Sequence, residues 1–296
     1  MSTFANIDLS SLPQPAAVAT WSFSAIVQAR LADFTQRMAA VGVTIDTTKL
    51  ESEPTVKFQE TGAYREGLVY ARINQAVLAT SLAWAAGDDL VVRAADFATQ
   101  KAAGESDPSL RRRAQLAWEA LSQGGTYGGY RYKALSAAPV DLADVAVYGY
   151  DDAPGLNKGD VCLVCLGAAT SGVPSSAARA AVKAAFPRAG RKTNDNVIVR
   201  AVAPANYSVD ATIFLNPGPD AASVVAAQTK ALNAFAAARR AIGASVTPGN
   251  IESVLGYSAP GLVYDVAVRS PAATIGDDPF AAPILTGARV VWAPRT

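Results

Sequence analysis

The stretch Pro139–Leu166, PVDLADVAVYGYDDAPGLNKGDVCLVCL, marks the point where the sequence changes from helical to alternating periodicity. Val145–Tyr148 and Asp160–Leu166 have the short apolar character of strands. Between them lies Pro154-Gly155, a dipeptide typical of turns. We therefore expect two strands joined by a turn, and the fold class is decided here.

Downstream of this stretch, the order of the elements is β-β-α-β and then β-α-α-β. That order favours an α+β region with two small sheet-and-helix layers, and not the strict alternation of a nucleotide-binding α/β fold. The predicted helices are Ser175–Phe186, Ala221–Ile242 and Thr247–Leu255, and the predicted strands are Asn196–Val202, Tyr207–Leu215, Val263–Val268 and Ala288–Trp292.

Upstream, the sequence predicts an arm followed by helices. Residues 1–20 contain prolines and have no helical period. The spacing of apolar residues predicts a helix over Trp21–Val41 and a long helix over Thr55–Ala86. Pro54 suits the first helical position, where its missing N–H costs nothing, and Gly87 suits a left-handed cap.

The chain is thus expected to be α+β, with an N-terminal helical bundle region followed by small sheet-and-helix α+β domains. Helices that begin at Asp107-Pro108 and at Tyr127 form a middle region before the strands. The predicted segments are an extended arm over 1–20, a helical bundle region over 21–98, a helical middle region over 99–139, an α+β domain over 140–204 and a second α+β domain over 205–296.

Composition excludes several classes of function. The 296 residues include no histidine and two cysteines, with a net charge of +1. A Ser-His-Asp triad, a histidine metal ligand and a four-thiolate metal site are therefore excluded, and the near-zero charge gives no field for binding nucleic acid. No apolar run is long enough to span a membrane, and the N-terminus has no signal-peptide pattern. We expect no cofactor, no metal, no nucleic acid and no membrane insertion.

Four short motifs each have a plain structural interpretation. Glu51 and Glu53 precede Pro54, so helix-end electrostatics is favoured over an acid/base pair. Cys162 and Cys165 are three apart in a strand, which places them on opposite faces of the sheet as buried apolar side chains. The other two motifs are the arginine run 111–113, interpreted as a solvated helix start, and the glycines at 124, 125, 128 and 129, interpreted as a tight turn between helices.

The long helix over Thr55–Ala86 carries polar residues beside one wide apolar face that includes Val56, Leu68 and Ile73. Such polar residues suit a seam between helices of different subunits, where they set the register, or they are simply exposed. Both alternatives stay open from the sequence. The polar positions concerned are Tyr64, Arg65, Glu66, Arg72 and Asn74.

An ordered series of short motifs resembles the baseplate J family of contractile-tailed bacteriophages. The resemblance extends from about residue 7 to about residue 292. It is carried by Leu50-Glu51-Ser52-Glu53-Pro54, Ala63-Tyr64-Arg65-Glu66, Arg72-Ile73-Asn74, Ala85–Leu90, Glu105-Ser106-Asp107, Gly124-Gly125 and Asn216–Pro219.

The resemblance implies a structural, non-enzymatic wedge subunit in the baseplate of a contractile tail, assembled in the host cytoplasm and located in the virion. It implies that two copies join one smaller I-like wedge protein, that C-terminal domains link wedges into a sixfold ring, and that the ring rearranges to trigger sheath contraction. Sheath-initiator-like and hub or spike proteins are the further implied partners. The implied interface residues are Glu51, Glu53, Tyr64, Arg65, Glu66, Leu68, Arg72, Ile73 and Asn74.

Two other classes of function are alternatives to a wedge subunit. A tail-associated, carboxylate-dependent cell-wall hydrolase would need paired acidic residues across a cleft, and the sequence shows no such motif. A different tail adaptor protein would have the same surface chemistry, and it would differ by purifying with the tail tube in place of a wedge partner.

Overall fold

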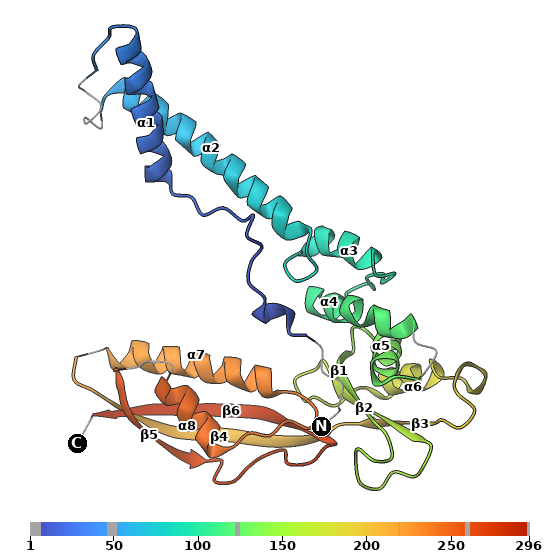
Figure 1. Ribbon diagram of the computed structural model, residues 1–296. Coiled ribbons are helices and arrows are strands. Elements are labelled where there is room, and N and C mark those ends of the chain that lie inside the picture. The colour runs from blue at the N-terminus through green and yellow to red at the C-terminus, as the bar shows by residue number, and fades with distance from the viewer. Residues whose placement is uncertain (1–6, 46–51, 122–124, 219, 258–260, 295–296) are drawn as a thin grey trace. The chain divides into compact units, whose positions relative to one another are not determined.

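The computed structural model describes the chain apart from residues 1–6, 46–51, 122–124, 219, 258–260 and 295–296 (Figure 1). The fold is α+β, as the sequence predicts. The described residues form two compact units, a helical one over residues 7–96 and a mixed one over residues 97–296. Each unit is described separately below, and the division into five segments stays a prediction.

The helical unit contains η1 (Leu9–Ser11), α1 (Phe23–Ala40), α2 (Pro54–Ala79) and α3 (Gly87–Ala95). Ser22 begins α1 by accepting a hydrogen bond from the Ala25 N–H, and Pro54 is at the start of α2 as predicted. The prediction that this helix continues to Ala86 is wrong. It ends at Ala79, and the C-cap residue Thr80 donates its hydroxyl to the Val77 carbonyl at 2.7 Å.

The mixed unit begins with α4 (Asp107–Leu116), η3 (Ala117–Leu121) and α5 (Tyr127–Ala137). Leu110 and Ala114 face the core, as their spacing predicts. The same spacing predicts Ala117 or Trp118, and Leu121, on this face; Ala117 is buried there, whereas Trp118 and Leu121 are 65% and 71% exposed. The tighter 3₁₀ winding of η3 rotates these side chains away from the face that α4 buries.

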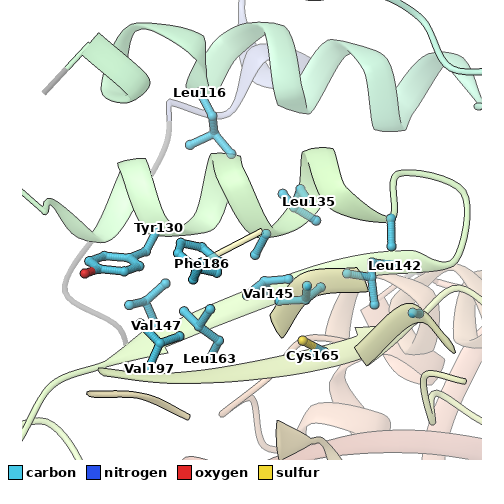
Figure 2. Close-up of a cluster of buried hydrophobic side chains, with 14 residues drawn as sticks. Leu116, Tyr130, Leu135, Leu142, Val145, Val147, Leu163, Cys165, Phe186 and Val197 are labelled. Atoms are coloured by element: carbon cyan, nitrogen blue, oxygen red, sulfur yellow. The ribbon is translucent and has the colours of Figure 1, made fainter. Parts of the chain in front are cut away.

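The first sheet has the strand order β1-β2-β3 and joins β1 (Leu142–Tyr148), β2 (Asp160–Gly167) and β3 (Asn196–Ala201). β1 and β2 are antiparallel, whereas β2 and β3 are parallel and connected through α6 (Ser176–Ala184). Figure 2 shows α5 above this sheet, with the stacked rings of Tyr130 and Phe186 and the side chains of Val147 and Leu163 filling the space between them.

The two cysteines lie on opposite faces of β2, which confirms the prediction from their spacing. Cys165 belongs to the core cluster under α5 and α6, and Cys162 belongs to the cluster on the other face with Tyr148 and Leu166. Both thiols are free and buried, and burial together with the neighbouring Cys162 raises the pKa of Cys165 to about 12. These are packing residues.

The second sheet has the order β5-β4-β6, with β4 (Ala203–Leu215) between β5 (Val263–Ser270) and β6 (Ala281–Pro294). β4 is antiparallel to β5 and parallel to β6. One face is covered by α7 (Ala221–Arg239) and α8 (Pro248–Tyr257) (Figure 1). The sequence predicts only the end of β6 because its first half contains Pro283, which a strand tolerates at a sheet edge.

The two sheets share a core. β3 is followed almost directly by β4, and Ala282 and Ile284 of β6 belong to the same cluster as Cys162 and Leu166 of β2. The Tyr148 hydroxyl at the end of β1 donates to the Pro279 carbonyl just before β6 at 2.6 Å. The mixed unit is therefore held together across both sheets.

The interpretation of the arginine run 111–113 as a solvated helix start is wrong for Arg113. Its guanidinium is buried and bonds both carboxylate oxygens of Glu105, at 2.8 and 2.7 Å. Glu105 also accepts from the Ala102 N–H and from the Ser109 hydroxyl. Burial raises the pKa of Glu105, but these hydrogen bonds outweigh it and leave the pKa below its usual range. The pair fixes the loop before α4 to the helix.

Candidate partner interface

The interface residues predicted from the sequence lie on α2, one face of which packs against α1. The inward face carries the buried residues Val56, Gln59, Ala63 and Gly67, spaced three or four apart as a helix face requires. From α1 the buried residue is Ile26. The two helices thus pair along one side of α2, and α1 does not cover the other side.

A tight contact fixes the start of α1 on α2. The Trp21 ring lies directly over Gly67 and stacks on Tyr70, with ring centroids 6.5 Å apart. A Cβ at position 67 would lie 2.7 Å from an atom of the Trp21 ring. Gly67 is therefore required for the close approach of the indole, and not for helix flexibility.

Two of the predicted interface residues make polar contacts within this chain. Glu66 pairs with Arg30 of α1 at 3.2 Å. The Asn74 amide bonds the main chain of Ala19 twice, accepting from its N–H at 2.9 Å and donating to its carbonyl at 2.8 Å. These polar side chains hold the arm and α1 against α2, a role that the sequence did not predict.

The remaining predicted residues of α2 lie on its outer face. Tyr64, Leu68 and Ile73 are 61%, 52% and 50% exposed, and Arg65 and Arg72 are exposed beside them. At about 100° per residue, Arg65, Leu68 and Arg72 lie opposite the line that packs on α1, whereas Tyr64 and Ile73 lie about 90° from that line on either side. We call these residues, together with the equally exposed Phe58 and Val69, the outer stripe of α2.

The prediction of one wide apolar face that includes both Val56 and Leu68 is wrong, because α2 has two apolar faces. Val56 faces α1, whereas Leu68 faces outward. Phe58 and Val69 were missed. Their separation of eleven residues is three helical turns, a spacing that places them on one line with each other and close to Ile73, four residues beyond Val69.

Glu53 is at the start of α2, as its place before Pro54 predicts. It adopts an extended backbone as the N-cap residue, without a side-chain bond to a helical N–H, and accepts from the Thr55 hydroxyl at 3.4 Å. Glu51 lies outside the described residues. Contact of these residues with another chain stays a prediction.

Replacing Gly67 with Ala is expected to destabilise the helical unit by about 1–3 kcal/mol, because the added methyl would overlap the Trp21 ring, which cannot move without losing its stack on Tyr70. Thermal unfolding followed by circular dichroism would measure the change.

The matched control is Gly62→Ala, one turn earlier on the same helix. A methyl there meets the guanidinium of the flexible Arg30 side chain, which can move at the expense of its partly exposed pair with Glu66, so with the better helix propensity of alanine the change in stability should stay within about 1 kcal/mol. Equal effects of both substitutions would contradict the close contact of Trp21 with Gly67.

Among the described residues, no group of three or more acidic or cysteine side chains is placed to hold a metal ion. In the same part of the chain, no helix is both long enough and apolar enough to cross a membrane.

Comparisons with known proteins identify the family. The model of the Baseplate J-like N-terminal domain matches residues 51–103, a range that includes the described parts of α2 and α3. Baseplate protein J of Escherichia phage P2 is 33% identical to this chain over 306 residues, covering 96% of this chain and 97% of the relative. Because the similarity extends over nearly the whole of both proteins, this chain belongs to the baseplate protein J family.

Proposed function

We propose that this protein is a structural wedge subunit of a contractile-tail baseplate and that two copies bind one smaller I-like partner through the outer stripe of α2. The observation that carries the proposal is the row of exposed apolar side chains on that stripe. Leu68, Val69 and Ile73 are each at least half exposed, and Phe58, three turns before Val69, is 73% exposed. Exposed apolar side chains grouped on one helix favour an interaction site.

The helical unit supports a hetero-oligomeric contact in a second way. Helices gain most of their stability from packing an apolar face, and α2 is 26 residues long. Among the described elements, α1 makes the most extensive contact with α2, through the inner face. Arg65 and Arg72 lie within the outer stripe, which favours a partner that supplies both apolar and acidic side chains.

The mixed unit is proposed to supply the contacts between wedges, over the region from Val145 to Val268. In this proposal the wedges form a sixfold ring around the hub and spike proteins, and rearrangement of the ring triggers contraction of the sheath. The protein would assemble in the host cytoplasm and act in the virion without an enzymatic activity. The five-segment division, with 205–296 as the ring-contact domain, belongs to the same proposal.

Co-expression with the smaller partner followed by native mass spectrometry tests the wedge complex. The expected mass is that of two copies of this chain with one partner, stable through size exclusion. A partner that elutes separately from a monomeric chain would contradict the proposal, and co-purification with tail tube alone would favour a tail adaptor.

A further inference from the structure

Two grooves in the mixed unit have the same construction. One, of about 470 Å³, lies between α6 and β3. The other, of about 610 Å³, lies between α8 and β5. In each case one face of a helix forms one wall and a strand at the edge of its sheet forms the other. Each groove therefore exposes a strand edge next to a helix.

The α6–β3 groove is basic. Arg179 and Lys183 of α6 line it, and no carboxylate does. The Asn196 N–H bonds the Gly159 carbonyl and the Val202 N–H bonds the Cys165 carbonyl, both on the β2 side. The N–H and C=O groups of successive residues in a strand point alternately to its two sides. The main-chain groups of Val197 and Val199 therefore point away from β2, toward the free edge of β3.

Lys183 covers part of that edge, because its ammonium donates to the Val197 carbonyl. A lysine at this place keeps a strand edge from pairing with any chain it meets. A carboxylate brought into the groove would attract the ammonium and leave the Val197 carbonyl free to pair. The groove thus favours a strand that places a carboxylate beside Lys183.

The α8–β5 groove is acidic. Glu252 of α8 and Asp265 of β5 line it, and no cation does. The other α8 residues on this wall are small, namely Gly249, Ser253 and Gly256. The facing wall of α6 in the basic groove likewise carries the small residues Ser176 and Ala180. Small side chains on both helices allow two helices to approach closely.

We propose that the two grooves are the two halves of one contact between copies of this chain. The β3 edge of one copy lies alongside the β5 edge of the next, with Arg179 and Lys183 facing Glu252 and Asp265. Because the two surfaces differ, each copy uses both, and such head-to-tail contacts close into a ring when the rotation fits. This contact would join neighbouring wedges in the ring, so it rests on the proposed function.

Charge reversal tests this contact on the full chain. The double variant Arg179→Glu/Lys183→Glu has two acidic grooves, and Glu252→Lys/Asp265→Lys has two basic grooves. In sedimentation velocity, each variant alone should lose the concentration-dependent self-association of the unmodified protein, by at least about tenfold in affinity. An equimolar mixture should recover it, because each acidic groove now meets a basic one. This recovery also shows that both variants are folded.

A cross-link provides the geometric readout. Ala180→Cys and Ser253→Cys introduce exposed thiols on α6 and α8, whereas Cys162 and Cys165 are buried. A mixture of the two single variants should form a mixed disulfide dimer under mild oxidation, and either variant alone should form far less. The control Lys158→Glu/Asp277→Lys changes exposed charges outside both grooves and should leave association unchanged.

Absence of the mixed dimer, or charge-reversed mixtures that stay monomeric, would overturn the proposal. Association through the outer stripe of α2 would persist in both charge-reversed variants, since it does not use these grooves. Failure of the groove contact is therefore distinguishable from failure of the wedge complex.

Discussion

Replacing Arg113 with Met is expected to destabilise the mixed unit by about 3–5 kcal/mol, because it leaves the Glu105 carboxylate buried without its cation. Arg113 also donates to the Gln100 carbonyl at 2.7 Å, so the loop over residues 99–106 should loosen at the same time. Urea unfolding followed by circular dichroism measures the loss, and hydrogen exchange of the loop amides measures the loosening.

The control is Lys101→Met, which removes a half-buried ion pair with Asp107 nearby. It should cost less than about 1 kcal/mol, as is usual for exposed pairs. An Arg113 substitution no more costly than this one would contradict the structural role of the buried pair.

The Arg113→Met variant should also change the pH dependence of the free energy of unfolding. In the unmodified protein the pKa of Glu105 is lowered. The ionised Glu105 carboxylate therefore stabilises the folded state at pH values above the ordinary carboxyl range, and this stabilisation is lost as the pH falls below that range. Without Arg113, burial raises the pKa of Glu105, and folding then favours the protonated form. The stability difference between the two proteins should therefore shrink on going from neutral pH toward about pH 5.

Replacing both Leu68 and Ile73 with Asp is expected to abolish the complex with the smaller partner. Both side chains are about half exposed in the chain alone, so the substitutions should leave its fold intact. Burying two carboxylates in place of apolar side chains costs several kcal/mol, and the affinity should fall by at least about 100-fold. Isothermal titration with the partner measures the loss.

Val41→Asp serves as the matched control, because Val41 is 72% exposed and lies outside the outer stripe, at the end of α1. It should bind the partner normally. If the double variant bound as tightly as this control, the outer stripe would not be the partner interface.

The sequence predicts the elements of the mixed unit well because their periodicities are local. The opposite placement of Cys162 and Cys165 follows from an odd spacing in a strand, and the start of α2 follows from the chemistry of Pro54. The second half of β6 is predicted and the first is not, since Pro283 breaks the pattern and only the neighbouring β4 explains its tolerance.

The candidate interface is only partly predictable, for a physical reason. A single helix pattern does not say which face meets its own chain and which meets another. The contacts of Glu66 with Arg30 and of Asn74 with Ala19 join residues 36 and 55 positions apart, so no local pattern reveals them. The local sequence also does not predict the burial of Arg113, because that burial depends on Glu105 folding back from the preceding loop.

The most direct test of the wedge-subunit proposal is electron microscopy of isolated tail particles that contain this chain with a gold-labelled tag. We expect the label to form a ring at the cell-facing end of the tail, co-localised with the smaller partner, before and after sheath contraction. Label along the tube or at the opposite end of the tail, or none on purified particles, would contradict it.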